Sequence, residues 1–125
     1  MEEIFLIKNL KEVKKFAQKL ARKIKTLLIS KKKLIFLFKG DLGYGKTTFI
    51  KEIAKALGIK AQLKSPTFIL WQIYDFNLKK EKFFLHHLDL YRLQPEELFK
   101  LSFSKKIKEK NNIFFIEWGE KLEKF

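Results

Sequence analysis

The sequence predicts an α/β fold, in which a mostly parallel sheet is flanked by helices, within a single domain over residues 1–125. Segments with apolar residues at helical spacing alternate with short apolar runs of strand length, and no linker or repeat interrupts them. A chain of 125 residues can bury one compact core. The chain has no cysteine, which excludes a disulfide framework and a cysteine-ligated zinc framework.

The first predicted elements are a strand, a long helix and a second strand. Residues 4–7 have the composition of a short strand, and Asn9 is suited to cap the helix that follows. The run 34–38 is short and apolar on both faces, which is typical of a buried parallel strand. Between them, lysines form the outer face of the helix, and apolar residues recur at helical spacing: Leu10, Val13, Phe16, Ala17, Leu20, Ile24 and Leu27.

The middle of the chain predicts a second helix and a hairpin. The helix begins at about Lys46 and ends at Gly58, a residue that suits a helix C-terminus. Residues 68–76 and 83–88 have strand patterns, and a polar turn at 77–82 would join them. One face of the helix is apolar: Phe49, Ile50, Ile53, Ala54 and Leu57.

The last third predicts a helix and a final strand. Pro95 suits a first helical position, and the two glutamates after it, Glu96 and Glu97, suit a first turn. The helical pattern becomes irregular near Ser102 and Ser104. Residues 113–116 form a last apolar run, which completes the alternation expected of a parallel sheet.

The segment between the strand at 34–38 and the second helix carries the clearest chemical motif. Gly40-Asp41-Leu42-Gly43-Tyr44-Gly45-Lys46-Thr47 has the spacing Gly-x-x-x-x-Gly-Lys-Thr, and Thr48 extends it. Glycines let the backbone turn its N–H groups toward phosphate, and the helix N-terminus favours the same anion. Lys46 is suited to the outer phosphates, and the Thr47 hydroxyl to magnesium. The alternative is a glycine-rich turn without a ligand, but the strand and helix around it favour a P-loop NTPase sandwich that binds ATP or ADP with Mg²⁺.

Two acids follow apolar strands and suit the magnesium side of such a site. Asp89 follows 83–88, and Glu117 follows 113–116. The carboxyl ends of parallel strands meet at one edge of a sheet, so both acids are expected beside the loop, with Lys46 as catalytic residues. Glu117 suits either water orientation or the metal shell. The competing interpretation for each is an exposed or capping carboxylate.

The residues alone give weaker support for a functional role of Thr67 and of two histidines. Thr67 follows Pro66 and suits a switch that senses the last phosphate, although the residues alone favour an ordinary Ser-Pro-Thr turn. His86 and His87 are adjacent, so on a strand they face opposite ways. No cysteine or acidic partner in the sequence makes them a convincing transition-metal site.

The net charge is +14, from 28 Lys and Arg against 14 Asp and Glu. Such a charge is typical of nucleic-acid binding, but a solvated, lysine-rich surface produced by codon bias explains it equally well. No signal-peptide pattern follows the acidic N-terminus, and no apolar run approaches the roughly 18 residues of a membrane helix. We therefore expect a cytoplasmic protein with no membrane partner.

Several segments in order resemble one family, TsaE. They are residues 40–49, Ser-Pro-Thr-Phe at 65–68, His-Leu-Asp-Leu-Tyr-Arg-Leu at 87–93, Pro-Glu-Glu-Leu at 95–98, and Ile-Glu-Trp-Gly-Glu at 116–120. The resemblance implies an ATPase that helps to install threonylcarbamoyl on the adenosine beside the anticodon of tRNA. In that family, ATP binding and slow hydrolysis are thought to reset the complex with TsaD and TsaB. Contact with tRNA would come through that complex, and no DNA partner is implied.

The resemblance also implies roles for individual residues. Thr47 and Glu117 would hold magnesium, Asp89 would be the Walker B acid, and Thr67 would lie in a switch-like loop. Family members usually continue with further strands, whereas this chain stops at Phe125, so either the protein is unusually short or its C-terminus is missing. Two other readings of the loop stay open: a small-molecule kinase, which the presence of only two arginines disfavours, and a nucleotide-dependent binding module with negligible catalysis.

Overall fold

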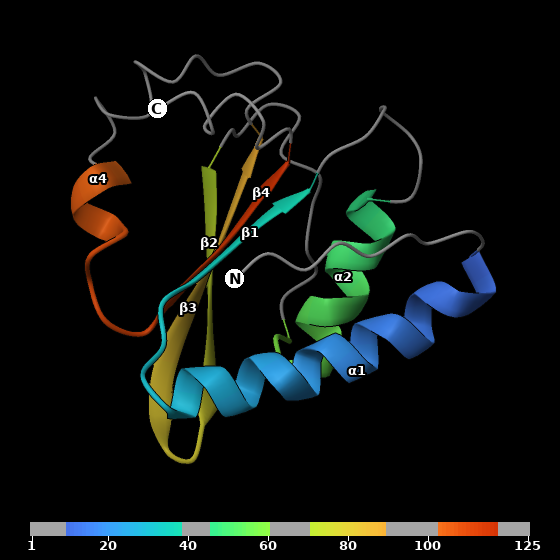
Figure 1. The fold of residues 1–125 in the computed structure, drawn as a ribbon, viewed down its shortest axis with the longest axis horizontal. Helices are drawn as coiled ribbons and strands as arrows, with labels where there is room; N and C mark the ends of the chain where they lie inside the picture. The colour runs from blue at the N-terminus through green and yellow to red at the C-terminus, as the bar shows by residue number, and fades with distance from the viewer. Residues whose placement is uncertain (1–9, 39–45, 61–70, 90–102, 118–125) are drawn as a thin grey trace.

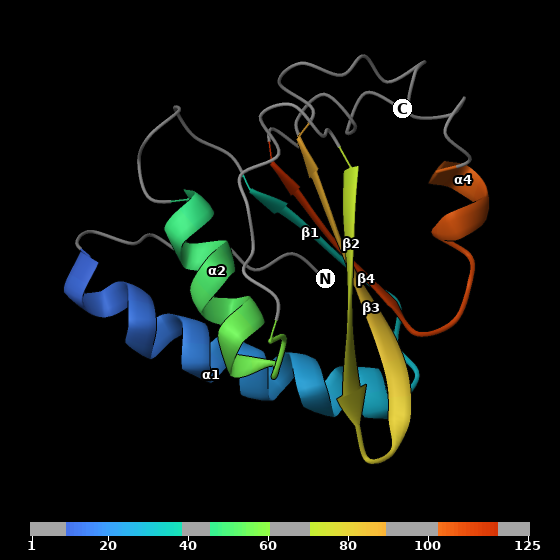
Figure 2. The same ribbon diagram turned by 180° about the vertical axis from the view of Figure 1, so that it is seen from behind.

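The computed structural model describes residues 10–38, 46–60, 71–89 and 103–117 (Figures 1 and 2). Four strands form one sheet in the order β1-β4-β3-β2. Strand β4 (Asn112–Glu117) pairs in parallel with β1 (Leu34–Phe38) and with β3 (Glu81–Asp89), and β2 (Trp71–Leu78) runs antiparallel to β3. The predicted α/β fold with a mostly parallel sheet is confirmed.

The register aligns the ends of the three parallel strands. Phe38 pairs with Glu117 on one side, and Asp89 pairs with Glu117 on the other. The chain enters the glycine-rich loop directly after β1, so these residues form the edge of the sheet from which that loop departs. This edge is called the carboxyl edge below.

Two helices cover one face of the sheet (Figure 1). Helix α1 (Leu10–Ile29) and helix α2 (Lys46–Ala56) pack against it with their apolar sides. On α1 the buried side ends at Leu28, whereas Leu27, which the periodicity favoured, is half-buried. All five residues predicted for the apolar face of α2 are buried. No helix in the described part of the chain is both long and apolar enough to cross a membrane.

Both helices end in the same hydrogen-bonded cap. After α2, Gly58 has φ +94° and donates to Lys55 O, while Ile59 N donates to Ala54 O at 3.0 Å. These are the two bonds of a Schellman cap, and they confirm Gly58 as the predicted stop. After α1 the equivalent position is Lys31, with φ 62°, so a lysine holds a backbone conformation that glycine adopts more readily.

The second face of the sheet corrects one prediction. Strand β1 was expected to be buried on both faces, but Ile35 and Leu37 are 43% and 36% exposed. Strand β1 has only β4 as a neighbour among the described strands, whereas β4 lies between two strands and is buried along its whole length. The short helix α4 (Phe103–Lys106) lies on this second face (Figure 1).

The predicted hairpin is confirmed, but its turn is shorter than expected. Strands β2 and β3 stay paired to Leu78 and Glu81, so only Lys79 and Lys80 form the turn. Their φ angles are 48° and 66°, as in a type I′ turn. The expected strand at 4–7, the cap at Asn9, and the helix from Pro95 lie outside the described residues.

Candidate functional site

The glycine-rich loop itself lies mostly outside the described residues. Gly40, Asp41, Leu42, Gly43, Tyr44 and Gly45 belong there, as does Thr67. The structure shows the elements on either side: β1 ends at Phe38, and α2 begins at Lys46, as predicted, with Thr47 and an exposed Thr48 in its first turn. The Phe38 and Phe49 rings pack at 6.1 Å between centroids, which holds the start of α2 against the end of β1.

The two predicted acids lie side by side at the carboxyl edge. Asp89 and Glu117 are register partners on adjacent parallel strands, so their side chains leave the same face of the sheet. That face is the one covered by α1 and α2. Glu117 is 6% exposed and Asp89 is half-buried. The expected convergence is therefore observed, while the chemical roles of the two acids remain predictions.

A histidine to which no role was assigned from the sequence, His87, holds Glu117. His87 Nε2 lies 2.8 Å from Glu117 Oε2, and the His87 side chain is fully buried. A carboxylate can only accept, so His87 donates through Nε2–H. This contact of His87 with an acid was missed at the level of sequence, where the two histidines were weighed only as transition-metal ligands. The signal was present: His87 stands two residues before Asp89, and strand alternation puts both on one face.

The second ring nitrogen of His87 is unusual. Nδ1 is the one buried side-chain nitrogen or oxygen without a hydrogen-bond partner among the described residues. A buried polar atom without a partner costs about 1–3 kcal/mol. An apolar side chain of similar size avoids that cost, so packing alone does not explain an imidazole here. What the imidazole adds is the hydrogen bond to Glu117.

His86 points to the opposite face, as predicted, and is fully engaged there. Trp71 Nε1 donates to His86 Nδ1 at 3.0 Å, and His86 Nε2 lies 2.8 Å from Asn112 Oδ1. Its ring also stacks on Phe114, with 4.4 Å between centroids. Burial lowers the pKa of His86 below its ordinary value, against the opposing effect of the Asn112 hydrogen bond. His86 is therefore a neutral structural histidine.

The donor set at the carboxyl edge suits a hard cation that keeps phosphate ligands. Among the described residues, no three His, Cys, Asp or Glu side chains are placed to hold a metal ion by themselves. Magnesium in phosphate-binding sites is held by one or two carboxylates together with phosphate oxygens, so three protein ligands of these types are not required. Asp89 and Glu117 fit that pattern, and Glu117 has the supporting hydrogen bond that such ligands usually have.

Several known proteins that are similar to this chain share one name. The family model described as "Threonylcarbamoyl adenosine biosynthesis protein TsaE" matches residues 7–125. A "tRNA threonylcarbamoyladenosine biosynthesis protein TsaE" of Rickettsia felis is 40% identical over 119 residues, which are 94% of this chain and 63% of the relative. The protein of that name from Rickettsia prowazekii is 41% identical over 88% of this chain and 69% of its own length. In Nostoc sp. the identity is 38%, over 70% of this chain and 54% of the relative. The chain thus spans between about half and about two thirds of these relatives.

Proposed function

Because the chain belongs to the TsaE family, we propose that it is an ATP-binding and slowly hydrolysing subunit of the machinery that installs threonylcarbamoyl on tRNA. The modified position would be the adenosine beside the anticodon, and nucleotide turnover would reset a complex with the TsaD and TsaB proteins. The observation that best supports it is the joint end of β1, β4 and β3, where two acids meet beside the start of the glycine-rich loop.

In this proposal the residues of the site have different tasks in phosphate chemistry. Backbone N–H groups from Gly40 to Thr48 cradle the phosphates, and Lys46 neutralises charge on the outer ones. Thr47, Asp89 and Glu117 would hold Mg²⁺, which when bound supplies further neutralisation of phosphate charge. Thr67 senses the last phosphate from its loop.

Glu117 has a second task in this proposal, which is to orient the attacking water. A carboxylate orients water only if its own plane is fixed, and His87 fixes it through Oε2. The other carboxylate oxygen, Oε1, would then be the one that serves the metal and the water. His87 is thus a positioning residue, which acts through Glu117 and does not itself touch the nucleotide.

The substitution Lys46→Ala tests the nucleotide site. We expect the affinity for ATP to fall roughly 10–100-fold, the equivalent of about 1.5–3 kcal/mol for a hydrogen bond to a charged group, and turnover to be lost. Lys55→Ala is the matched control, because Lys55 is an exposed lysine on the same helix. Isothermal titration calorimetry measures the affinity. Unchanged ATP binding in Lys46→Ala would refute the assignment.

The wider role has its own test in cells. A strain that lacks its own TsaE-family gene should lose the threonylcarbamoyl nucleoside from its tRNA, and expression of this chain should restore it. Mass spectrometry of digested tRNA measures the nucleoside, and the Lys46→Ala variant serves as the negative control. Full restoration by that variant would show that nucleotide binding is not the contribution of this protein.

A further inference from the structure

We propose that the outer side of α1 and the lysines that follow it form a docking surface for the phosphate backbone of a structured RNA. This basic surface consists of Lys14, Lys15, Lys19, Arg22, Lys23 and Lys25 on α1, with Lys31, Lys32 and Lys33 after it. The choice of tRNA as that RNA rests on the proposed function, but the surface itself is argued from charge and geometry.

The positive charge of this chain is concentrated in one stretch. Residues 13–40 contain ten Lys or Arg and no Asp or Glu, so they contribute +10 of the net +14. The other 97 residues together contribute only +4. Lysine enrichment by codon bias would spread the excess along the chain and would not exclude acids from a run of 28 residues. The location of the charge therefore points to an interaction surface.

The fold places this charge on one side of one element. The sheet-facing side of α1 is buried by its apolar residues, and the basic side chains lie on its remaining sides, where all but the half-buried Lys25 are exposed. One exposed acid, Glu12, also lies on this helix, in its first turn. A helix of 20 residues is about 30 Å long, enough to follow a series of phosphates along a duplex. Figures 1 and 2 show α1 running along the margin of the molecule beside α2, and its apolar side packs against the same face of the sheet.

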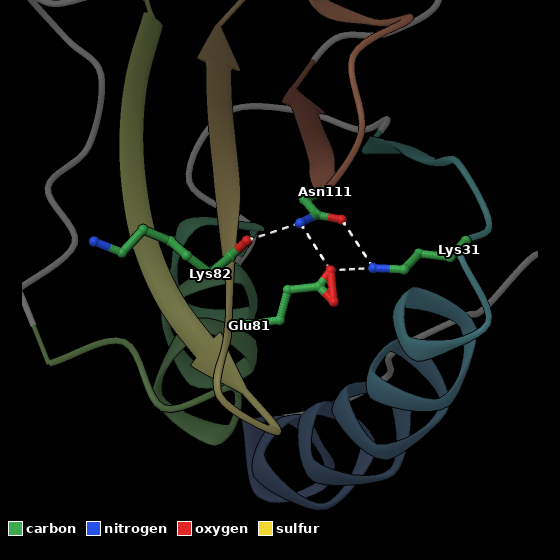
Figure 3. Close-up of polar contacts among 4 residues, drawn as sticks. All are labelled: Lys31, Glu81, Lys82 and Asn111. Carbon is green, nitrogen blue, oxygen red and sulfur yellow. Dashed lines mark hydrogen bonds and ion pairs between the residues drawn. The ribbon is translucent and has the colours of Figure 1, made fainter.

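The hairpin turn extends the basic surface at the C-terminal end of α1. Lys31 forms an ion pair with Glu81, which follows the exposed turn lysines Lys79 and Lys80 (Figure 3). Asn111 also contacts this carboxylate, with Nδ2 at 3.0 Å from Oε2. The acid at this corner is therefore already neutralised, and the lysines around it leave the corner positive.

A hollow beside α1 is suited to bind a single phosphate. It lies open between α1 and α2 and is lined by Gln18, Ala21, Arg22, Lys25 and Ala56. Arg22 is one of only two arginines in the chain, and a guanidinium can hold a phosphate through two parallel hydrogen bonds. The Gln18 amide supplies a further donor at the same place.

The same observations disfavour two other partners for this surface. Membrane-surface helices insert an apolar side into lipid, but the apolar side of α1 is occupied by the protein core. Protein interfaces are centred on aromatic or aliphatic residues and are poor in lysine, whereas the outer side of α1 offers no aromatic residue. Phosphate contacts need neither feature, and they predict binding that is insensitive to RNA sequence.

The test compares two variants with the same change in charge. Lys15→Gln, Lys19→Gln and Arg22→Gln are combined in the α1 variant, and Lys51→Gln, Lys105→Gln and Lys108→Gln in the control, whose three lysines are exposed and lie outside the surface. Fluorescence anisotropy measures the affinity of each protein for an unmodified tRNA transcript between 50 and 200 mM salt. Circular dichroism melting confirms that each variant is folded.

We expect the affinity of the wild type for tRNA to fall steeply with salt, and the α1 variant to bind tRNA at least tenfold more weakly. The slope of log K against log salt concentration should be shallower by about three in the α1 variant. The control should lose less than threefold. Equal losses in both variants, no wild-type binding at 150 mM salt, or tighter binding to anionic phosphatidylserine vesicles than to tRNA would each overturn the proposal.

The outcome is separable from the proposed function. The α1 variant should bind ATP normally, because none of its three residues lies at the carboxyl edge. Conversely, Lys46→Ala should bind tRNA as the wild type does when nucleotide is absent. A wild-type protein that binds tRNA but not ATP would refute the nucleotide role alone, and a wild-type protein that binds ATP but not tRNA would refute the basic surface alone.

Discussion

The two ends of the parallel strands each hold a glutamate, and the surroundings of the two carboxylates differ. At the carboxyl edge, Glu117 is buried and its partner is an imidazole, His87, whose second nitrogen has no hydrogen-bond partner. At the other end Glu81 is part-exposed, and both Lys31 and Asn111 bind it (Figure 3). One carboxylate is buried and held by an imidazole, and the other lies at the surface and is paired with a lysine.

The two ends also differ in which feature destabilises them. The cost at the carboxyl edge is a buried polar atom without a partner, next to the residues we assign to metal binding. At the opposite end the polar contacts of this cluster are made, but the backbone holds four non-glycine residues at positive φ: Lys31, Lys79, Lys80 and Asn111. Strain of this kind persists where surrounding structure or function demands the residue. Each end should therefore respond to a different kind of substitution.

The largest expected effect is at the carboxyl edge. His87→Leu removes the hydrogen bond that orients Glu117, and we expect the affinity for Mg-ATP to fall about 10–100-fold, as for other supporting ligands of metal sites. Affinity for ATP in excess EDTA should change little. Calorimetric titrations with and without magnesium measure the two affinities.

Two further variants decide whether His87 acts through its hydrogen bond. His87→Gln should restore most of the magnesium-dependent affinity, because its amide N–H reaches about as far as Nε2–H. His86→Leu is the neighbouring control, since that side chain lies on the other face of the sheet. If His87→Leu bound Mg-ATP as tightly as the wild type, a positioning role for His87 would be excluded.

The second effect is a gain of stability at the end of the sheet opposite the carboxyl edge. Replacement of Lys79 by Asn and Lys80 by Gly places the residues that favour positive φ in the type I′ turn, and we expect about 1–2 kcal/mol of added stability. Urea denaturation measures it. The pair Lys79→Ala and Lys80→Ala removes the same charges but keeps both Cβ atoms, so it should give no such gain. An equal gain in both pairs would attribute the effect to charge repulsion.

The sequence predicted those parts of the fold that depend on local pattern. The apolar face of α2 and the stop at Gly58 follow from helical periodicity and from one permissive residue. The meeting of Asp89 and Glu117 was predictable because parallel strands share an edge. That rule needs only the direction of the strands, which short apolar runs and intervening helices already indicate.

The parts that the sequence did not predict depend on register and position. The His87–Glu117 contact requires knowing that β3 lies beside β4 and how the two are aligned. Ile35 and Leu37 are exposed because β1 has one neighbour among the described strands. An apolar run has the same sequence pattern in a strand with one neighbour and in a strand with two, so the sequence does not distinguish the two positions. The turn at Lys79 was predicted too long because two lysines carry none of the usual turn signals.

The third effect is the pH dependence of stability that His86 produces. Burial lowers the pKa of His86, so the folded protein binds a proton there less readily than the unfolded chain, whose ordinary value is 6.5. Stability is therefore complete above about pH 6.5 and is lost as pH falls below it. Lys106 favours the neutral form of His86 and Glu109 opposes it.

In His86→Gln the loss of unfolding free energy between pH 7 and 5 should be shallower, by at most about 1.4 kcal/mol per pH unit for one proton. Parallel pH curves for variant and wild type in urea denaturation would contradict this.

The smallest effect concerns Glu81, whose carboxylate lies at the surface. Hydrogen bonds from Lys31 and Asn111 lower its pKa below the ordinary 4.5. The stabilisation is therefore present above pH 4.5 and declines as pH falls through the lower value in the folded state. Glu81→Gln should lower the thermal midpoint slightly at pH 7 and hardly at all near pH 3, because the wild-type carboxylate is by then taking up protons. Salt should weaken the difference at pH 7, as expected of an exposed ion pair. A larger loss at pH 3 than at pH 7 would show that this end of the sheet depends on packing by Glu81 and not on its charge.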